Sequence, residues 1–187
     1  MQTNSEEFWD YIAKKWEKNG HIRDRSSEFV EAAKYIKGNV LEVGFGTGSF
    51  CKYIPNVQYM GMDISQGMVD NARINYPDHL FLKVDLEKLP SKQWQDAFGT
   101  VVCFQTLEHF HEPDLIKVMD KLKIISRYQL IFSVPNGIPT DTYRKANGHW
   151  MDWADSEVCK KFFSGWGVVE LIPCNDNHIA GVVTWTK

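Results

Sequence analysis

The stretch VLEVGFGTG, residues 40–48, decides the fold of this 187-residue chain. Its first four residues follow an apolar pattern typical of a buried β-strand, and glycine then occupies every second position at Gly44, Gly46 and Gly48. Glycine lets a backbone turn sharply and approach a ligand without a Cβ in the way. A helix that starts after such a loop offers free N–H groups to an anion. The stretch therefore predicts a strand that ends in a ligand-binding loop.

Strands and helices alternate along the rest of the chain. Further strands are predicted at residues 58–62, 80–84, 100–104, 129–134, 168–172 and 179–186. Helices are predicted at residues 5–20, 27–36, 49–54, 65–75, from Pro113 onward and at 155–163, with Ser5 and Ser65 as caps and Gly20 as the end of the first helix. This alternation predicts a Rossmann-like, three-layer α/β sandwich. Its mostly parallel, seven-stranded sheet would end in a C-terminal antiparallel hairpin.

The length predicts a single domain over residues 1–187. The composition, with 43% hydrophobic and 24% charged residues, is that of an ordinary globular protein and excludes wholesale disorder. A net charge of −3 gives no basic excess for gripping phosphates, so nucleic acid is not an expected partner. We find no apolar run near the roughly 18 residues of a membrane helix, and the N-terminus lacks a signal-peptide pattern, so a cytoplasmic protein is expected. The four cysteines lie far apart, which predicts reduced thiols rather than a metal held by cysteines.

Two acidic residues follow later strands, on the side of the sheet where ligands bind. Asp63 ends the second strand 19 residues after Gly44, where an acid can accept hydrogen bonds from ribose hydroxyls. Asp85 ends the third strand and could meet an adenine amino group. A helix cap or a surface acid is the alternative reading of each. Ser49 stands where a G-x-G-x-x-G fingerprint would need its third glycine, which argues against a nicotinamide dinucleotide.

Four segments, LEVGFGTG, MGMDIS, VDLEKLP and VVCFQTLEHF, resemble in order and spacing the motifs of class I S-adenosylmethionine-dependent methyltransferases. The resemblance covers roughly residues 27–187, and the last segment is most similar to the ubiquinone-biosynthesis O-methyltransferases. It implies S-adenosylmethionine as cofactor and S-adenosylhomocysteine as product. It also implies that residues 1–37 are N-terminal lid helices and that residues 135–153 form an acceptor-side loop.

The resemblance also assigns roles in cofactor binding. Gly44 and Gly46 would hold the methionine part, and Asp63 would bind the ribose. Ile64 would pack on the adenine, Asp85 and Leu86 would read its edge, and Gln105 would border the methionine end and the acceptor. The full predicted cofactor-binding set is Glu42, Gly44, Phe45, Gly46, Gly48, Asp63, Ile64, Asp85, Leu86 and Gln105.

Histidines are the candidate catalytic residues, because a hydroxyl or protonated amine must lose a proton when it is methylated and histidine titrates near neutral pH. His149, beside Trp150 and Trp153, is the leading candidate for the base, and a loop histidine in contact with tryptophan is the alternative. His109 is the second candidate, with a structural role in its loop as the alternative. His21 could touch the acceptor.

No metal is predicted. In the ubiquinone-type enzymes a Glu-x-x-Glu-His arrangement can hold a divalent ion, but here Gln105 replaces the first acid. Glu108 and His109 alone make a poor magnesium site.

The predicted function is S-adenosylmethionine-dependent methyl transfer to a small-molecule acceptor, at a hydroxyl oxygen. The protein would align the acceptor for in-line displacement and exclude water. The alternatives are an N-methyltransferase, a non-catalytic cofactor-binding regulatory module and a nicotinamide-dependent oxidoreductase. The sequence leaves the identity of the acceptor and the oligomeric state open.

Overall fold

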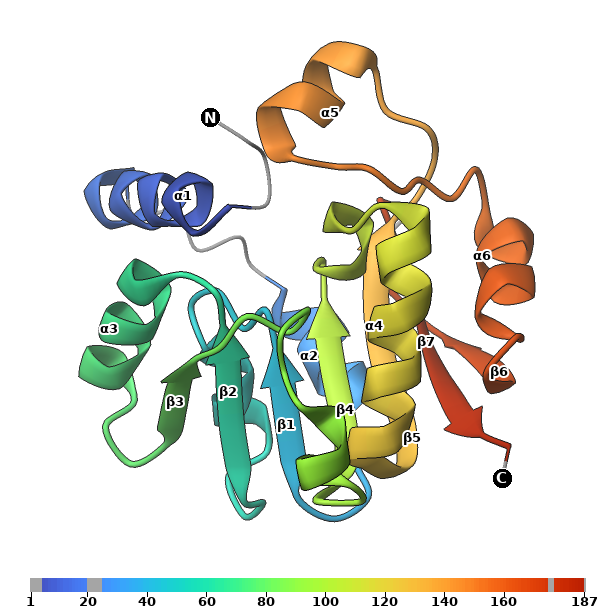
Figure 1. Ribbon diagram of the computed structural model, residues 1–187, viewed down its shortest axis with the longest axis horizontal. Helices are drawn as coiled ribbons and strands as arrows, with labels where there is room; N and C mark the ends of the chain where they lie inside the picture. The colour runs from blue at the N-terminus through green and yellow to red at the C-terminus, as the bar shows by residue number, and fades with distance from the viewer. Residues whose placement is uncertain (1–4, 20–24, 175–176, 187) are drawn as a thin grey trace.

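A computed structural model describes residues 5–19, 25–174 and 177–186 (Figure 1). A seven-stranded sheet forms its centre, in the order β3-β2-β1-β4-β5-β7-β6. The strands are β1 (Val40–Val43), β2 (Tyr59–Asp63), β3 (Leu80–Lys83), β4 (Phe98–Phe104), β5 (Ser126–Pro135), β6 (Gly167–Ile172) and β7 (His178–Trp185). The first five strands are parallel, and β7 lies antiparallel between β5 and β6. The predicted fold class and terminal hairpin are confirmed.

Helices cover both faces of the sheet, because the buried strands send alternate side chains to opposite sides. In β4, Val101 and Cys103 join a core cluster under α4 (Glu112–Ile125) and α6 (Ser156–Phe163). Val102 and Phe104 join the opposite cluster, under α2 (Ser26–Ala33) and α3 (Gln66–Asn75). Figure 1 shows α4 in front of the sheet and α2 behind it.

Side-chain caps begin three of the predicted helices. The Ser5 Oγ accepts a hydrogen bond from the Phe8 N–H at 3.2 Å, at the start of α1 (Glu6–Asn19). Ser65 caps α3 in the same way, and Asp155 caps α6. Such contacts satisfy N–H groups that the first helical turn leaves unpaired. Gly20, the predicted end of the first helix, and His21 lie outside the described residues.

Two segments differ from the prediction. The helix expected at residues 49–54 is a short 3₁₀ helix, η1 (Ser49–Tyr53). The stretch after β5, expected to be a loop, contains α5 (Asp141–Asn147). Thr140 caps this helix by accepting from the Tyr143 N–H, and Gly148, with a φ of 70°, ends it. None of its residues is buried, so no apolar stripe in the sequence marks it.

Two helices stand at the carboxyl ends of the parallel strands. Figure 1 shows α1 on the side of β2 and β3, and α5 on the side of β4 and β5. The loops that follow β1, β2 and β4 reach the same end of the sheet. This arrangement brings the predicted site residues together.

Candidate functional site

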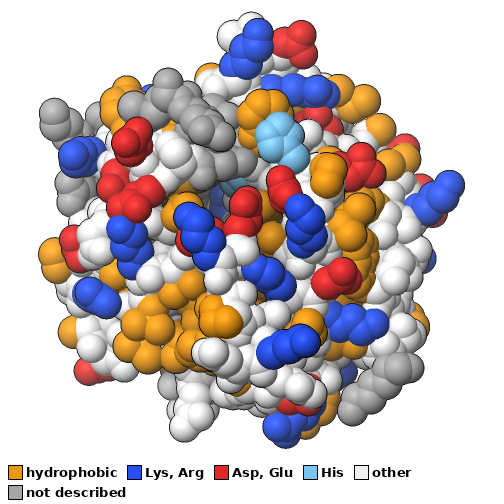
Figure 2. Space-filling view, viewed as in Figure 1, with side chains coloured by type: hydrophobic (Ala, Val, Ile, Leu, Met, Phe, Trp, Pro, Cys, Tyr) orange, Lys and Arg blue, Asp and Glu red, His pale blue; other side chains and the backbone are white. Residues whose placement is uncertain are grey.

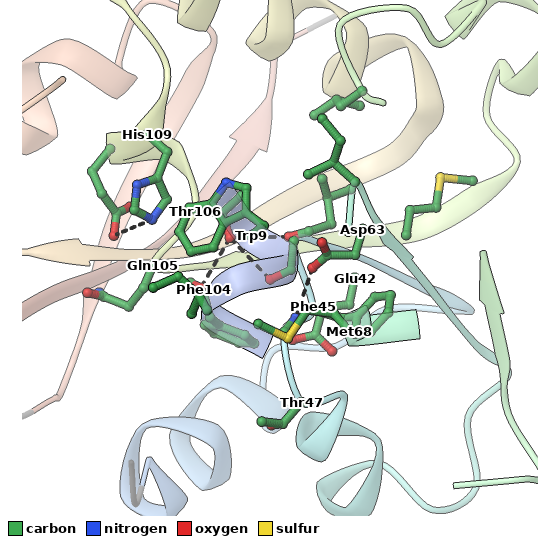
Figure 3. A pocket seen from close by; sticks show the side chains of 18 of the residues that line it. Trp9, Glu42, Phe45, Thr47, Asp63, Met68, Phe104, Gln105, Thr106 and His109 are labelled. Carbon is green, nitrogen blue, oxygen red and sulfur yellow. Dashed lines mark hydrogen bonds and ion pairs between the residues drawn. The ribbon is translucent and has the colours of Figure 1, made fainter. Parts of the chain in front are cut away.

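A cavity of about 680 Å³ opens at the carboxyl ends of β1, β2 and β4, and α1 covers part of it. Eleven of the twelve predicted site residues line it. They are Glu42, Gly44, Phe45, Gly46, Asp63, Ile64, Asp85, Leu86, Gln105, His109 and His149. Figure 3 shows Glu42 and Asp63 toward one end of this cavity, and Gln105 and His109 toward the other.

The glycine loop after β1 forms one wall of the cavity. Gly44, Gly46 and Gly48 all have positive φ, as the spacing of glycines predicted. Gly48 is the one predicted residue absent from the lining: a Cβ there would lie 2.8 Å from the Phe81 ring. Gly48 therefore serves the packing of the loop against the core.

Asp63 ends β2 and holds this loop in place. Its Oδ2 accepts a hydrogen bond from the Gly46 N–H at 3.1 Å, and its Oδ1 accepts from the Ser65 N–H at 2.9 Å. Burial raises the pKa of Asp63 to about 6, although these backbone N–H groups favour the charged form. Ser65, rather than Asp63, caps α3, so the cap alternative for Asp63 is excluded.

Asp85 follows β3 and has contacts both at the cavity and within its own turn. It lines the cavity with Ile64 and Leu86. Its Oδ1 also accepts from the Glu87 N–H at 3.0 Å, and its Oδ2 pairs with Lys88 at 2.7 Å. The residue thus fixes its own turn while part of it faces the cavity.

Glu42 lies deeper, in β1, with only 2% of its surface exposed. The Tyr59 hydroxyl donates a hydrogen bond to its Oε2. Burial raises the pKa of Glu42 to about 8. At physiological pH the Glu42 carboxyl is therefore mostly neutral, and it lies at the bottom of the cavity near the glycine loop.

Gln105 and His109 mark the opposite end of the cavity. Gln105 has a φ of 53°, unusual for a residue with a side chain, and its Nε2 donates to the Ser133 Oγ at 3.3 Å. The Nδ1 of His109 lies 3.1 Å from the Gly148 carbonyl oxygen, which can only accept, so Nδ1 carries the proton. Burial lowers the pKa of His109 to about 3, and its ring is neutral at physiological pH.

His149 meets His109 at this end, although 40 residues separate them in sequence. Their ring centroids are 5.1 Å apart, and the Tyr143 ring lies 5.4 Å from His149 on the other side. Trp9 of α1 contacts the His109 ring at 4.6 Å. Four rings from α1, α5 and two loops thus stand in sequence along one wall.

The two tryptophans expected beside His149 point elsewhere. Trp153 is 1% exposed and packs between Phe162 and Phe163 in the core. Trp150 is 45% exposed, with its ring 3.8 Å from that of His111. Neither lines the cavity that contains His149.

Comparison with known proteins assigns this architecture to a family. The methyltransferase-domain family matches residues 40–127, from β1 into β5. The chain carries a class I, S-adenosylmethionine-dependent methyltransferase domain. The matched segment includes Gly44, Asp63, Asp85, Gln105 and His109, whereas α1 and His149 lie outside it. No curated protein matches this sequence.

Solved structures share the fold of this methyltransferase. The CurJ carbon methyltransferase is 17% identical with a TM-score of 0.66 over 82% of this chain, which spans about half (51%) of that structure. The magnesium protoporphyrin IX methyltransferase of Synechocystis PCC 6803, solved with S-adenosylmethionine, is 18% identical with a TM-score of 0.62 and coverages of 94% and 84%. A structure from Rhodobacter sphaeroides whose name gives a Zn-dependent alcohol dehydrogenase is 13% identical, with a TM-score of 0.74 and full coverage of both chains. At these identities the likeness shows the fold alone, so the family match decides against the oxidoreductase alternative.

Several residues that line the cavity gave no signal in the sequence. Trp9 and Tyr143 reach the cavity, and Arg25 lines it and donates from Nη1 to the Phe104 carbonyl at 3.4 Å. Phe8, Ile12 and Trp16 of α1 also line the cavity. Arg25 is a single charged residue just before α2, so it is not part of any hydrophobic periodicity that could have marked it.

In the part of the chain that the structure describes, no helix has the length and apolar character needed to cross a membrane.

Three side chains of the methyltransferase could hold a metal ion together. Donor atoms of Glu108, His109 and His149 all lie within 4.8 Å of one another. Glu108 is 1% exposed, and among the described residues its Oε2 has no hydrogen-bond partner. The prediction of no metal counted only Glu108 and His109, because the sequence gave no sign that His149 lies beside them. The absence of a metal therefore stays a prediction.

Proposed function

We propose that this methyltransferase domain transfers a methyl group to a hydroxyl oxygen of a small molecule. The supporting observation is one continuous cavity with two different ends. One end has the glycine loop and buried Asp63, and the other has the paired rings of His109 and His149. The first suits a charged nucleoside, and the second suits a group that must give up a proton.

The residues of the first end fit S-adenosylmethionine. Asp63 retains acceptor capacity beyond its two backbone hydrogen bonds and can take those of the ribose hydroxyls. Gly44 and Gly46 line the cavity where the amino-acid end would lie, and Ile64 and Leu86 would offer apolar surface to the adenine. When bound, this cofactor supplies a methyl group already activated on a positively charged sulfur.

At the second end, His149 is the proposed proton acceptor. It is 8% exposed and lines the cavity, so it can meet the acceptor while bulk water is largely excluded. His109 is the proposed positioning residue, because its Nδ1–H holds the Gly148 carbonyl next to His149. Its low pKa makes it a poor proton acceptor near neutral pH.

A small acceptor fits what surrounds the cavity. Its outer wall consists of α1 and the segment around α5, with Trp9, Tyr143 and Asn147 as lining side chains. Figure 2 shows Lys and Arg side chains interspersed with Asp and Glu over the face in view, rather than a basic stripe. Mixed charge of this kind does not favour a nucleic-acid substrate. We further propose that the protein works in the cytoplasm.

Exchange of His149 for alanine tests the proposal. We expect His149→Ala to lower turnover by about a hundredfold or more, the usual contribution of a general base, while affinity for S-adenosylhomocysteine stays unchanged in calorimetry. His111→Ala is the matched control, since His111 is exposed and lies outside this cavity. Products from a panel of alcohols, phenols and amines are identified by mass spectrometry. Unchanged turnover in His149→Ala, or methylation of amines alone, would contradict the proposal.

A further inference from the structure

The helix α1 forms a cover whose inner side reaches the cavity. Phe8, Trp9, Ile12 and Trp16 all line the cavity from this helix. A Cβ at Gly46 would lie 3.4 Å from the Trp16 ring, so the cover approaches the glycine loop closely. A helix in this position needs contacts that hold it there.

Asp10 makes the polar contact between this cover and the body of the domain. Its Oδ1 accepts a hydrogen bond from the Ser65 hydroxyl at 2.5 Å and another from the Gly67 N–H at 3.1 Å. The Ser65 Oγ already caps α3 by accepting from the Met68 N–H. Asp10 therefore supplies a second cap to the same helix from a different helix, and its negative charge faces the positive end of the α3 dipole.

The ionised form of Asp10 is the one that these contacts favour. Burial would raise the pKa of Asp10, but hydrogen bonds from Ser65 and Gly67, with nearby Lys83 and Lys14, hold it below its usual value. Hydrogen bonds to a charged acceptor are about twice as strong as neutral ones. Lys83 also pairs with Glu6 of α1, next to the same junction.

Close packing accompanies this polar contact. A Cβ at Gly67 would lie 3.0 Å from the Ala13 Cβ and 3.6 Å from the Asp10 Oδ1. Ala13 is 1% exposed, so α1 packs closely against the start of α3 at this point. Glycine at position 67 is thus what lets the two helices approach.

Ser65 links the cover to the nucleoside end of the cavity. Its N–H donates to Asp63 Oδ1 at 2.9 Å, and its hydroxyl donates to Asp10. Trp9, the residue before Asp10 in α1, contacts the ring of His109. One rigid helix therefore joins the residue proposed for the ribose to the rings proposed for the acceptor.

We propose that Asp10 is a positioning residue for methyl transfer: by binding Ser65 and Gly67 it holds α1 closed over the cofactor and keeps Trp9 against His109. The catalytic part of this inference rests on the proposed function. Release of Asp10 frees the cover, so the cofactor leaves faster and water enters the reacting end.

Two unrelated changes test the contact. Asp10→Ala removes the acceptor, and Gly67→Ala pushes α1 away without altering charge. Alanine also favours a helix more than glycine does, so α3 itself is kept. Glu7→Gln is the matched control, because Glu7 is an exposed acid of the same helix and is not part of the lining of this cavity. Circular dichroism and the melting temperature verify that each variant is folded.

In stopped-flow fluorescence, we expect both variants to release S-adenosylhomocysteine about tenfold faster or more, the effect of losing a charge-assisted hydrogen bond. The KM for the cofactor should rise more than kcat falls, and Glu7→Gln should behave as the unaltered protein. An unchanged release rate in both variants would overturn the inference.

Hydrogen exchange without any ligand separates this inference from the proposed function. The amides of α1 should exchange faster in Asp10→Ala and Gly67→Ala than in Glu7→Gln, even if no methyl acceptor is ever found. Equal protection of α1 in all three variants would show that Asp10 does not hold the helix.

Discussion

Asp63 meets two demands that oppose each other. It must be buried to reach both the glycine loop and a bound nucleoside, yet burial raises its pKa to about 6 and disfavours the charge that makes it a strong acceptor. Below that pH the carboxyl is protonated and loses acceptor capacity. Above that pH the carboxyl is ionised, and the desolvation cost of its buried charge is already part of the stability of the folded protein.

Cofactor affinity should therefore depend on pH through Asp63, in the range near pH 6. We expect binding of S-adenosylhomocysteine to strengthen as the pH rises through about 6, because the ribose hydroxyls donate to the ionised carboxylate. Asp63→Asn should weaken binding by about 1–3 kcal/mol at pH 7 and remove the step near pH 6. Calorimetry between pH 5 and 8 measures both effects. A step of the same size in Asp63→Asn would assign it to another group.

At the scale of single elements, the sequence predicted best where the signal is local. The strand at residues 40–43, the glycine loop and the cap at Ser65 depend on residues next to one another, and all three are confirmed. The helix α5 buries no residue and has no apolar stripe. Its Thr140 cap and its Gly148 end are residue types that are also common in loops, so the sequence predicts a loop there. Trp153 lies in the core because its ring partners there are Phe162 and Phe163, nine and ten residues later in the sequence.

The end of α5 makes a testable contribution to the acceptor side. Gly148 has a φ of 70° and its carbonyl oxygen accepts the His109 Nδ1–H. Alanine is strained in this left-handed conformation by roughly 1–2 kcal/mol, so Gly148→Ala should shift this carbonyl and with it His149. We expect a lower kcat with unchanged affinity for S-adenosylhomocysteine, measured by steady-state kinetics and calorimetry.

Gly137→Ala is the control for that variant. Gly137 also has a positive φ, and an added Cβ there would meet no atom within 4 Å. The control should lower the melting temperature without changing kcat. If the two variants lose kcat equally, strain in the loop rather than the contact with His109 is responsible.

At the scale of the whole molecule, the two ends of the cavity differ in how they are encoded. The end proposed for the cofactor comes from one continuous segment within residues 40–127, the part that matches the methyltransferase-domain family. The acceptor end is assembled from α1, the loop after β4 and the segment around α5, which meet only in the folded chain. Spacing along the sequence could therefore predict Asp63, whereas the contact between His109 and His149 required the complete fold.

The same assembly brings Glu108 beside these two histidines and makes the absence of a required metal a testable prediction. If His149 accepts the acceptor's proton, the nitrogen that does so cannot also bind a metal ion, so dialysis against a chelator should leave turnover unchanged. Added Zn²⁺, which favours nitrogen ligands, should bind at the three donors and inhibit the enzyme. Glu108→Gln should weaken that inhibition, since it removes the charged ligand. Turnover that falls on chelation and returns with a metal ion would instead show that Glu108, His109 and His149 work as a metal centre.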